Sequence, residues 1–297
     1  MKVLLGCDVD PVLPGVLANP SNGTDIWACL RLLDRMVESF GAKLPPITWL
    51  IRCDESVRFC TGTLDSGFLA RESFWRSVID RGHEVGWHMH LISFKRADGC
   101  FGFDPKPAWL RAAFEALASH LPVVSTRTGW DYCSNYLMEQ FEDFGIRVDF
   151  SALPGNIIWH QAGPDILRVD WLRCPYAPYH PSTVDYQSAG QMSLLEVPIA
   201  QFRNPLPAIV RRAAWRLGHG CMSFAGLRSR TRMLTELWDG LPRSPSPVWA
   251  FYFHPEDLSA GGLDRLIQNV ERLRALPDVQ FVTTSALARS MTPKDRV

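Results

Sequence analysis

The sequence lacks the features that would place it in a specialised structural class. Its eight cysteines form no C-x-x-C pair and have no regular spacing, so neither a zinc ribbon nor a disulfide framework is predicted. No apolar run approaches the roughly 20 residues needed to cross a bilayer, and no internal repeat is present. We therefore expect reduced, mostly buried thiols in a cytoplasmic protein.

The chain also has no excess of charge, because 31 basic side chains balance 31 acidic ones. This balance gives no general attraction to nucleic acid or to anionic membranes, so no nucleic-acid partner is predicted. The opening letters "MKVLLGC" do not indicate a lipoprotein signal, because Cys7 comes before an apolar stretch of roughly 7–15 residues has formed. Any membrane contact is expected to be local and peripheral, at the inner membrane face.

Short apolar runs alternate with longer amphipathic stretches along the 297 residues, a pattern typical of β/α units. Strands are predicted at 2–10, 47–52, 83–90, 123–129, 148–152, 193–199, 249–255 and 279–284. Helices are predicted at 24–40, 70–81, 107–119, 133–144, 227–239 and 261–275. Seven or eight strands with helices between them favour one closed or nearly closed barrel, so residues 1–297 are predicted to form a single domain.

Two segments interrupt this alternation. Residues 153–191 are rich in proline, glycine and aromatic side chains and are predicted to form an extended loop excursion. Residues 203–240 are predicted to form a basic helical insertion, and in its first part, 203–220, apolar residues stand between arginines. This pattern favours an ordinary amphipathic surface helix. The alternative is a helix that lies at a membrane interface or binds a phosphate of the substrate.

Polar side chains share one face at the ends of three predicted strands. Asp8 and Asp10 alternate at the end of the first strand, and His88 and His90 alternate in the strand 83–90. His254 ends the strand 249–255. Because strand side chains alternate between faces, the intervening apolar residues are expected to pack against helices while these polar groups point into the barrel.

Active sites of β/α barrels lie at the C-terminal ends of the strands, so these five side chains are expected to meet there. Carboxylate and imidazole groups are suitable ligands for Zn²⁺ and for comparable divalent metals, and a catalytic metal site keeps three protein ligands and one open position. One carboxylate and one histidine would remain. Metal-assisted hydrolysis needs such groups as general base and general acid.

The ordered motifs "DVD", "GHEVGWH", "RTGW", "VDFSALPG", "LLEVPI" and "FHPEDL" resemble those of the polysaccharide deacetylase superfamily, carbohydrate esterase family 4 and its cytoplasmic relatives. The resemblance runs from residue 3 to about residue 285. It implies a distorted (β/α)7 barrel and metal-dependent removal of an acyl group from a sugar or lipid-linked sugar. The "DVD" and "GW" variants are most similar in style to the branch that deformylates a lipid-linked amino-arabinose.

The resemblance also implies roles for individual residues. Asp8 matches the general base of the family, and Asp10 matches its metal-binding aspartate. His88 matches the first metal-binding histidine, Arg127 matches the arginine that orients the base, and His254 matches the general acid that protonates the leaving amine. These matches imply a Zn²⁺ cofactor or another divalent metal.

The sequence departs from the family pattern at Ile92, where the family usually has its second metal-binding histidine. We predict His90 as the replacement, because residues i and i+2 of a strand point the same way. His83 lies on the opposite face and is expected to make a structural hydrogen bond. Contacts to the substrate are predicted for three further residues, namely Trp130, Tyr179 and His180.

Two alternatives to a sugar deacylase remain open from the sequence. The missing histidine at position 92 motivates the first, a catalytically silent domain that binds a glycan or a lipid-linked sugar. The second is a barrel hydrolase that acts on a non-sugar amide, since the superfamily includes enzymes for cyclic ureides. Metal analysis and product analysis would distinguish these three hypotheses.

Overall fold

A curled parallel sheet forms the centre of the structure, a computed structural model that describes residues 1–13, 25–95, 100–162, 165–200, 246–259 and 261–291. Its strands follow the order β10-β7-β6-β3-β2-β1-β11, and β12 pairs with the first residues of β1. All eight predicted strands are present. Their bounds are β1 Lys2–Val9, β2 Thr48–Arg52, β3 Glu84–Met89, β6 Ser125–Thr128, β7 Val148–Asp149, β10 Leu195–Glu196, β11 Val248–Phe253 and β12 Gln280–Val282.

The two ends of this seven-strand path meet. Beyond β10, Ile199 forms a parallel bridge with Ala250 of β11, and the amide of Ala200 donates to the Ala250 carbonyl at 2.9 Å. The strand pairs along the path are all parallel. The described residues therefore form a distorted (β/α)7 barrel, as predicted from the sequence.

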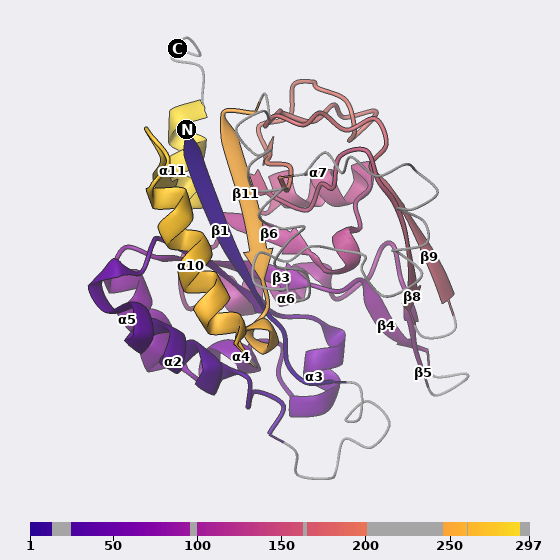
Figure 1. Cartoon of the computed structure of the whole chain (residues 1–297). Helices are drawn as coiled ribbons and strands as arrows, with labels where there is room; N and C mark the ends of the chain where they lie inside the picture. The colour runs from indigo at the N-terminus through magenta and orange to yellow at the C-terminus, as the bar shows by residue number, and fades with distance from the viewer. Residues whose placement is uncertain (14–24, 96–99, 163–164, 201–245, 260, 292–297) are drawn as a thin grey trace.

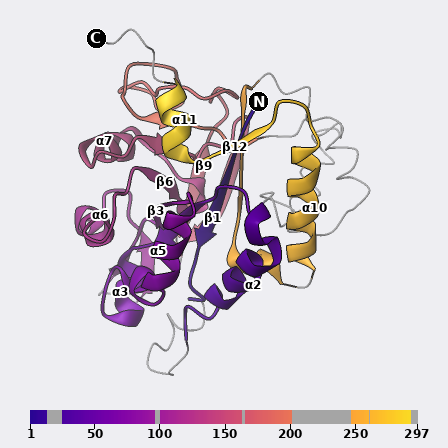
Figure 2. The ribbon, with the colours of Figure 1, turned by 90° about the vertical axis from the view of Figure 1, so that its left-hand side faces the viewer.

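Helices flank the sheet (Figure 1). Figure 2 shows α6 and α7 on one side of β1, and α2 and α10 on the other. Within the described residues, no helix is long and apolar enough to cross a membrane. The predicted insertion 203–240, with its helix 227–239, lies outside the described residues. The helix bounds are α2 Leu30–Phe40, α3 Glu55–Thr61, α4 Ser66–Leu69, α5 Glu72–Asp80, α6 Leu110–Ala118, α7 Asn135–Asp143, α10 Gly262–Arg274 and α11 Thr284–Met291.

Two antiparallel hairpins extend from the barrel. The first pairs β4 (Ile92–Lys95) with β5 (Cys100–Phe103), and the second pairs β8 (Ile157–Ala162) with β9 (Asp165–Asp170). The prediction of an extended loop over 153–191 was therefore wrong for β8 and β9. Apolar and polar residues alternate there, so one face of the hairpin is buried, including Leu167 and Val169, and the other is exposed.

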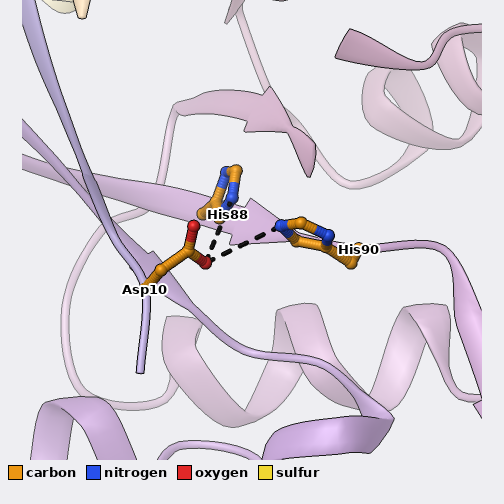
Figure 3. A group of neighbouring side chains, drawn as sticks. All are labelled: Asp10, His88 and His90. Carbon is orange, nitrogen blue, oxygen red and sulfur yellow. Dashed lines mark ion pairs between the residues drawn. The ribbon is translucent and has the colours of Figure 1, made fainter. Parts of the chain in front are cut away.

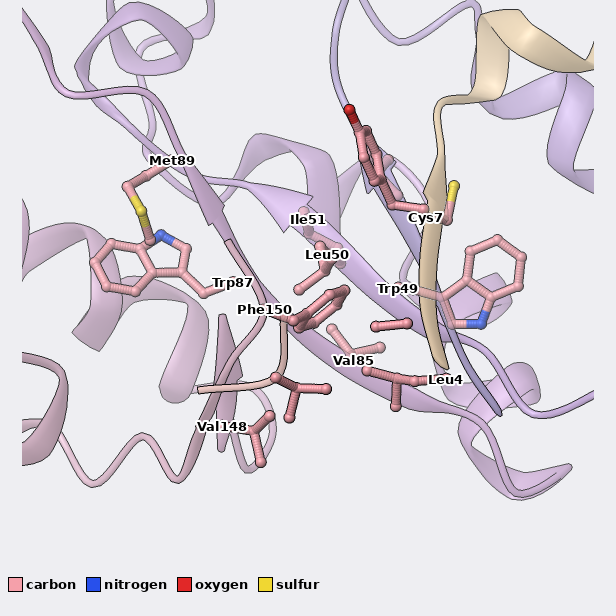
Figure 4. Packing of buried hydrophobic residues seen from close by; sticks show 14 of the residues in the cluster. Leu4, Cys7, Trp49, Leu50, Ile51, Val85, Trp87, Met89, Val148 and Phe150 are labelled. Atoms are coloured by element: carbon pink, nitrogen blue, oxygen red, sulfur yellow. The ribbon is translucent and has the colours of Figure 1, made fainter. Parts of the chain in front are cut away.

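Apolar side chains from several strands pack together in the core (Figure 4). Leu4, Leu50 and Phe150 are almost fully buried there. Gly6 makes room for the aromatic ring, because a Cβ atom at this position would lie 2.5 Å from Cε2 of Phe150. Asp8 follows Gly6 on the same face of β1. The polar cluster at the end of the strands thus lies next to closely packed apolar side chains.

His83 has the structural role that the sequence predicts. It is buried just before β3, and its Nδ1 atom accepts a hydrogen bond from the Ile47 amide at 3.1 Å. Burial, with a smaller contribution from Arg81, lowers the pKa of His83 from 6.5 to about 4. The folded protein therefore keeps this ring neutral.

This buried ring predicts a stability loss in acid. As the pH falls from 6.5 towards 4, the unfolded chain binds a proton at His83 that the folded chain does not, which lowers the free energy of unfolding by up to about 3 kcal/mol. Urea denaturation of the wild type and His83→Gln should show their stability difference shifting in favour of the variant between about pH 7 and about pH 4.5. A difference that is independent of pH would contradict this account.

Candidate metal site

Six predicted site residues meet at the C-terminal ends of neighbouring strands. Asp8 is in β1 and Asp10 follows it, His88 is in β3, Arg127 is in β6, and His254 follows β11. The register pairs His88 with Arg52 of β2 on one side and with Arg127 on the other. His90 lies one residue beyond β3.

Asp10, His88 and His90 form a group that could hold a metal ion (Figure 3). The Oδ1 atom of Asp10 lies 3.5 Å from Nε2 of His88 and 3.7 Å from Nε2 of His90. One potential ligand atom from each residue lies within 4.8 Å of the others. Two imidazoles and a carboxylate are a donor set that Zn²⁺ accepts in catalytic sites.

The environment of His88 fits a metal ligand. Its Nδ1 atom is 2.6 Å from the carbonyl oxygen of Arg127, and because a carbonyl only accepts, Nδ1 must donate the proton. Nε2 then has a lone pair directed at the group. That atom is buried and has no hydrogen-bond partner in the described part of the chain. Such an orienting bond on the far nitrogen is usual for metal-binding histidines.

The charges at the site favour the protonation states that ligands need. Burial alone would raise the pKa of Asp10, but His88 when protonated and Arg52, which is always charged, hold it well below its usual value, with smaller contributions from His90 and His254 when they are protonated. Burial and then Arg52 hold the pKa of His90 well below 6.5. Asp10 is therefore ionised and His90 is neutral at physiological pH.

Asp8 is held on one side only. One of its oxygens, Oδ2, accepts a hydrogen bond from the Arg127 guanidinium, which also donates to Asp131. The guanidinium carbon lies 3.6 Å from the centroid of the Tyr252 ring. The other oxygen, Oδ1, is buried and has no hydrogen-bond partner among the described residues. Asp8 thus presents a carboxylate oxygen that can accept a proton.

His254 faces three carboxylates. Its Nε2 atom lies 3.7 Å from Oδ2 of Asp8 and 3.7 Å from Oδ2 of Asp10, and its Nδ1 atom lies 3.5 Å from Oδ2 of Asp257. Burial would lower the pKa of His254, but Asp257, Asp8 and Asp10 together raise it to about 9. The side chain is 34% exposed, so a substrate can reach it.

Trp130 borders the group, next to His90. The two ring centroids are 4.6 Å apart, and Trp130 has a positive φ of 57°, a conformation that few non-glycine residues adopt. Gly129 permits this contact, because a Cβ atom there would lie 2.2 Å from the His90 ring. The role of Trp130 in substrate binding stays a prediction.

Tyr179 has a hydrogen-bond partner within the excursion 153–191, and His180 has one just beyond it. The hydroxyl of Tyr179 is buried and donates to the Tyr186 carbonyl at 2.7 Å. Nδ1 of His180 lies 3.0 Å from the Leu194 carbonyl oxygen. Their predicted contact with the substrate also stays a prediction.

Ile92 lies in the first hairpin, where a ligand to the group is not expected. It is buried in β4, and its carbonyl accepts a hydrogen bond from Trp109 at 3.1 Å. The chain turns directly after His90, because the Ile92 amide donates to the His90 carbonyl at 2.8 Å. His90 is thus the last residue of this segment that faces Asp10.

Four charged residues that contact the predicted ones are not predicted from the sequence, namely Arg52, Asp54, Asp131 and Asp257. A signal was present for the first two. In "IRCDES", a cation and a helix-capping aspartate followed by serine come directly after an apolar strand, which is the pattern of a strand end leading into a helix.

No family model matches the sequence, and no curated protein matches it. Among solved structures, the chain is similar to a polysaccharide deacetylase of Mycobacterium smegmatis, with 16% identity, a TM-score of 0.55, and coverage of 97% of this chain and 89% of the other. A polysaccharide deacetylase of Pseudomonas aeruginosa and Puue allantoinase both have a TM-score of 0.51 and 11% identity, with coverage of 97% and 89%. The chain thus has the fold of the polysaccharide deacetylases, a distorted (β/α)7 barrel.

Proposed function

We propose that this protein is a metal-dependent hydrolase that removes an N-acyl group, acetyl or formyl, from an amino sugar of a glycan or lipid-linked glycan precursor. The main support is the buried Nε2 of His88, which has no hydrogen-bond partner among the described residues and is directed at Asp10 and His90. Asp8 and His254 stand beside this group, as a base and an acid would. The deacetylase fold adds support for the sugar amide as substrate.

Asp10, His88 and His90 are the proposed metal ligands. A divalent metal, with Zn²⁺ the best match to two imidazoles and a carboxylate, would supply a Lewis acid that polarises the acyl carbonyl. Arg52 forms an ion pair at 3.1 Å with Oδ1 of Asp10, the same oxygen that faces the two histidines. This fixes the carboxylate before the substrate arrives, so that little reorganisation is needed during the reaction.

Asp8 is the proposed general base. Its Oδ1, which accepts no hydrogen bond from the residues that the structure describes, takes a proton from the attacking water, whose oxygen forms a bond to the acyl carbon. Arg127 holds the other oxygen of Asp8 in place, so the carboxylate cannot rotate away from the water.

His254 is the proposed general acid. When the bond between the acyl carbon and nitrogen breaks, its ring donates a proton to the departing amine, and a free carboxylic acid and an amino sugar result. Asp257, which faces Nδ1, orients the ring so that Nε2 points to the reaction centre.

The test is an acyl-release assay with the purified protein. Matched N-acetylated and N-formylated amino sugars are incubated with the protein, with and without a chelator, and free acetate and formate are measured. Release that stops with the chelator and returns with Zn²⁺ is the expected result. Metal binding without release from any sugar would instead support a catalytically silent glycan-binding domain.

A non-sugar amide is the second candidate substrate. The likeness to Puue allantoinase favours it, because that protein is named for a different substrate on the same fold. The same assay therefore includes allantoin as a third compound. Faster hydrolysis of allantoin than of either amino sugar would show that the substrate is a ureide and not an amino sugar.

A variant tests the general acid separately. His254→Gln is expected to reduce turnover by about 10²–10⁴-fold, because glutamine cannot donate a proton to the leaving amine. Bound zinc, measured by elemental analysis, should equal that of the wild type, since His254 is not among the proposed ligands. Turnover within threefold of the wild type, on the order of 1 kcal/mol or less, would remove His254 from this role.

The location of the protein and its substrate form are also proposals. We place the protein in the cytoplasm, and a lipid-linked substrate would bring it to the inner membrane face through residues 203–220. That segment lies outside the described residues. Replacing Arg211, Arg212 and Arg216 with alanine, with liposome binding and turnover as readouts, would test it.

A further inference from the structure

We propose that Asp54 is the positioning residue that makes His90 a metal ligand. This inference rests on the proposed metal-dependent function and deepens it, because it explains how position 90 can take the place of a ligand at position 92. Asp54 is fully buried between β2 and α3. Its two carboxylate oxygens have different tasks.

One carboxylate oxygen of Asp54, Oδ1, caps the N-terminus of α3. It accepts hydrogen bonds from the backbone amides of Ser56 at 3.0 Å and Val57 at 3.2 Å, and from the Ser56 hydroxyl. These bonds satisfy donors at the first turn of α3 that have no partner within the helix. This end of the carboxylate is therefore fixed to a rigid element.

The other carboxylate oxygen, Oδ2, contacts residues of the proposed metal site. It accepts a hydrogen bond from the backbone amide of His90 at 3.0 Å and one from Nε of Arg52 at 2.7 Å. Through its NH1 group, Arg52 in turn reaches Oδ1 of Asp10 at 3.1 Å. Asp54 thus contacts the backbone of one proposed ligand and the partner of another.

The hydrogen bond from the His90 amide to Asp54 matters because His90 lies beyond the last paired residue of β3. The pairing of β2 with β3 ends at Arg52 and His88, and His90 follows the last residue of β3. Directly afterwards the chain turns into the first hairpin. The rule that i and i+2 point the same way requires extended backbone, and the bond from Asp54 fixes the backbone at this point.

Two substitutions separate the capping of α3 from the hydrogen bond to the His90 amide. Asp54→Asn and Asp54→Ser both keep a side-chain oxygen that can cap α3, because serine and asparagine are good N-cap residues. Neither offers a second acceptor to the His90 amide: asparagine places a donor there, and serine has no second atom. The helix should remain formed in both variants, while His90 loses its anchor.

The experiment titrates wild type, Asp54→Asn, Asp54→Ser, His90→Ala and the double variant Asp54→Asn/His90→Ala with CoCl₂. The visible absorption of bound Co²⁺ reports the coordination geometry, which a general loss of stability would not change. Each single substitution at Asp54 is expected to lower Co²⁺ affinity by about 10–100-fold and to give the spectrum of His90→Ala. If Asp54 acts through His90, the double variant should bind no more weakly than His90→Ala alone.

Ser134→Ala is the matched control. Ser134 caps α7 with a bond to the Leu137 amide at 3.3 Å, so its loss should lower the melting temperature and leave Co²⁺ affinity unchanged. Wild-type affinity and spectrum in both Asp54 variants would overturn this inference, and so would losses that multiply in the double variant. A wild type that binds no Co²⁺, or whose binding does not depend on His88, would overturn the proposed function itself.

Discussion

Replacing His88 with alanine is expected to abolish high-affinity metal binding and, with it, hydrolysis. His88 supplies the buried Nε2 atom, for which the described part of the chain offers no hydrogen-bond partner. Losing a residue that merely orients a ligand costs about 10–100-fold in metal affinity, so losing this nitrogen itself should cost more. Asp10 and His90 would then be the two proposed ligands that remain of the group.

The measurement is zinc content after dialysis, together with a competitive titration against a chromophoric chelator. His83→Gln is the matched control, because His83 is a buried histidine just before the same strand, and its Nδ1 accepts a hydrogen bond from the Ile47 backbone amide. The control should keep one zinc per chain while His88→Ala keeps none. Equal zinc content in both variants would show that the metal, if bound, is held elsewhere.

Replacing Asp8 with asparagine should reduce turnover by about 10³-fold, within the range of general-base catalysis, while zinc stays bound. Asparagine has nearly the same shape, and its oxygen can still accept the hydrogen bond from Arg127. Its amide then replaces the open Oδ1 atom and cannot accept a proton. The defect is therefore expected in the chemical step rather than in metal or substrate binding.

Turnover number and KM, measured on the same acylated sugar, distinguish a defect in the chemical step from a defect in substrate binding. The turnover number should fall and KM should stay within a few-fold of the wild type. Asp131→Asn is the comparison, because Asp131 contacts the same guanidinium but is not the proposed base; it should lose less than tenfold, about 1.4 kcal/mol. If Asp8→Asn loses no more than Asp131→Asn, another group is the base.

The sequence predicted the elements that depend on local pattern. Alternation placed Asp8 and Asp10 on one face of β1 and His88 and His90 on one face of the chain at β3, and the structure brings these four together. It also separated His83 from them. Because successive side chains of any strand point to opposite faces, a single sequence is sufficient to predict which residues share a face.

The sequence did not predict contacts made by residues far apart in the chain or by unusual backbone. The bond from Asp54 to the amide of His90 joins residues 36 positions apart, and no local pattern specifies such a pair. The hairpin of β8 and β9 was hidden by a composition typical of loops. The positive φ of Trp130 and Asp131 is imposed by their surroundings, which a sequence pattern does not contain.

The most direct test of the metal site is anomalous diffraction at the zinc absorption edge from crystals of the protein grown with zinc. The account predicts one strong peak per chain at about 2.0–2.2 Å from ligand atoms of Asp10, His88 and His90. Oδ1 of Asp8 should face the open side of that peak without binding it. A peak that His90 does not contact, or no peak among these three residues, would contradict the account.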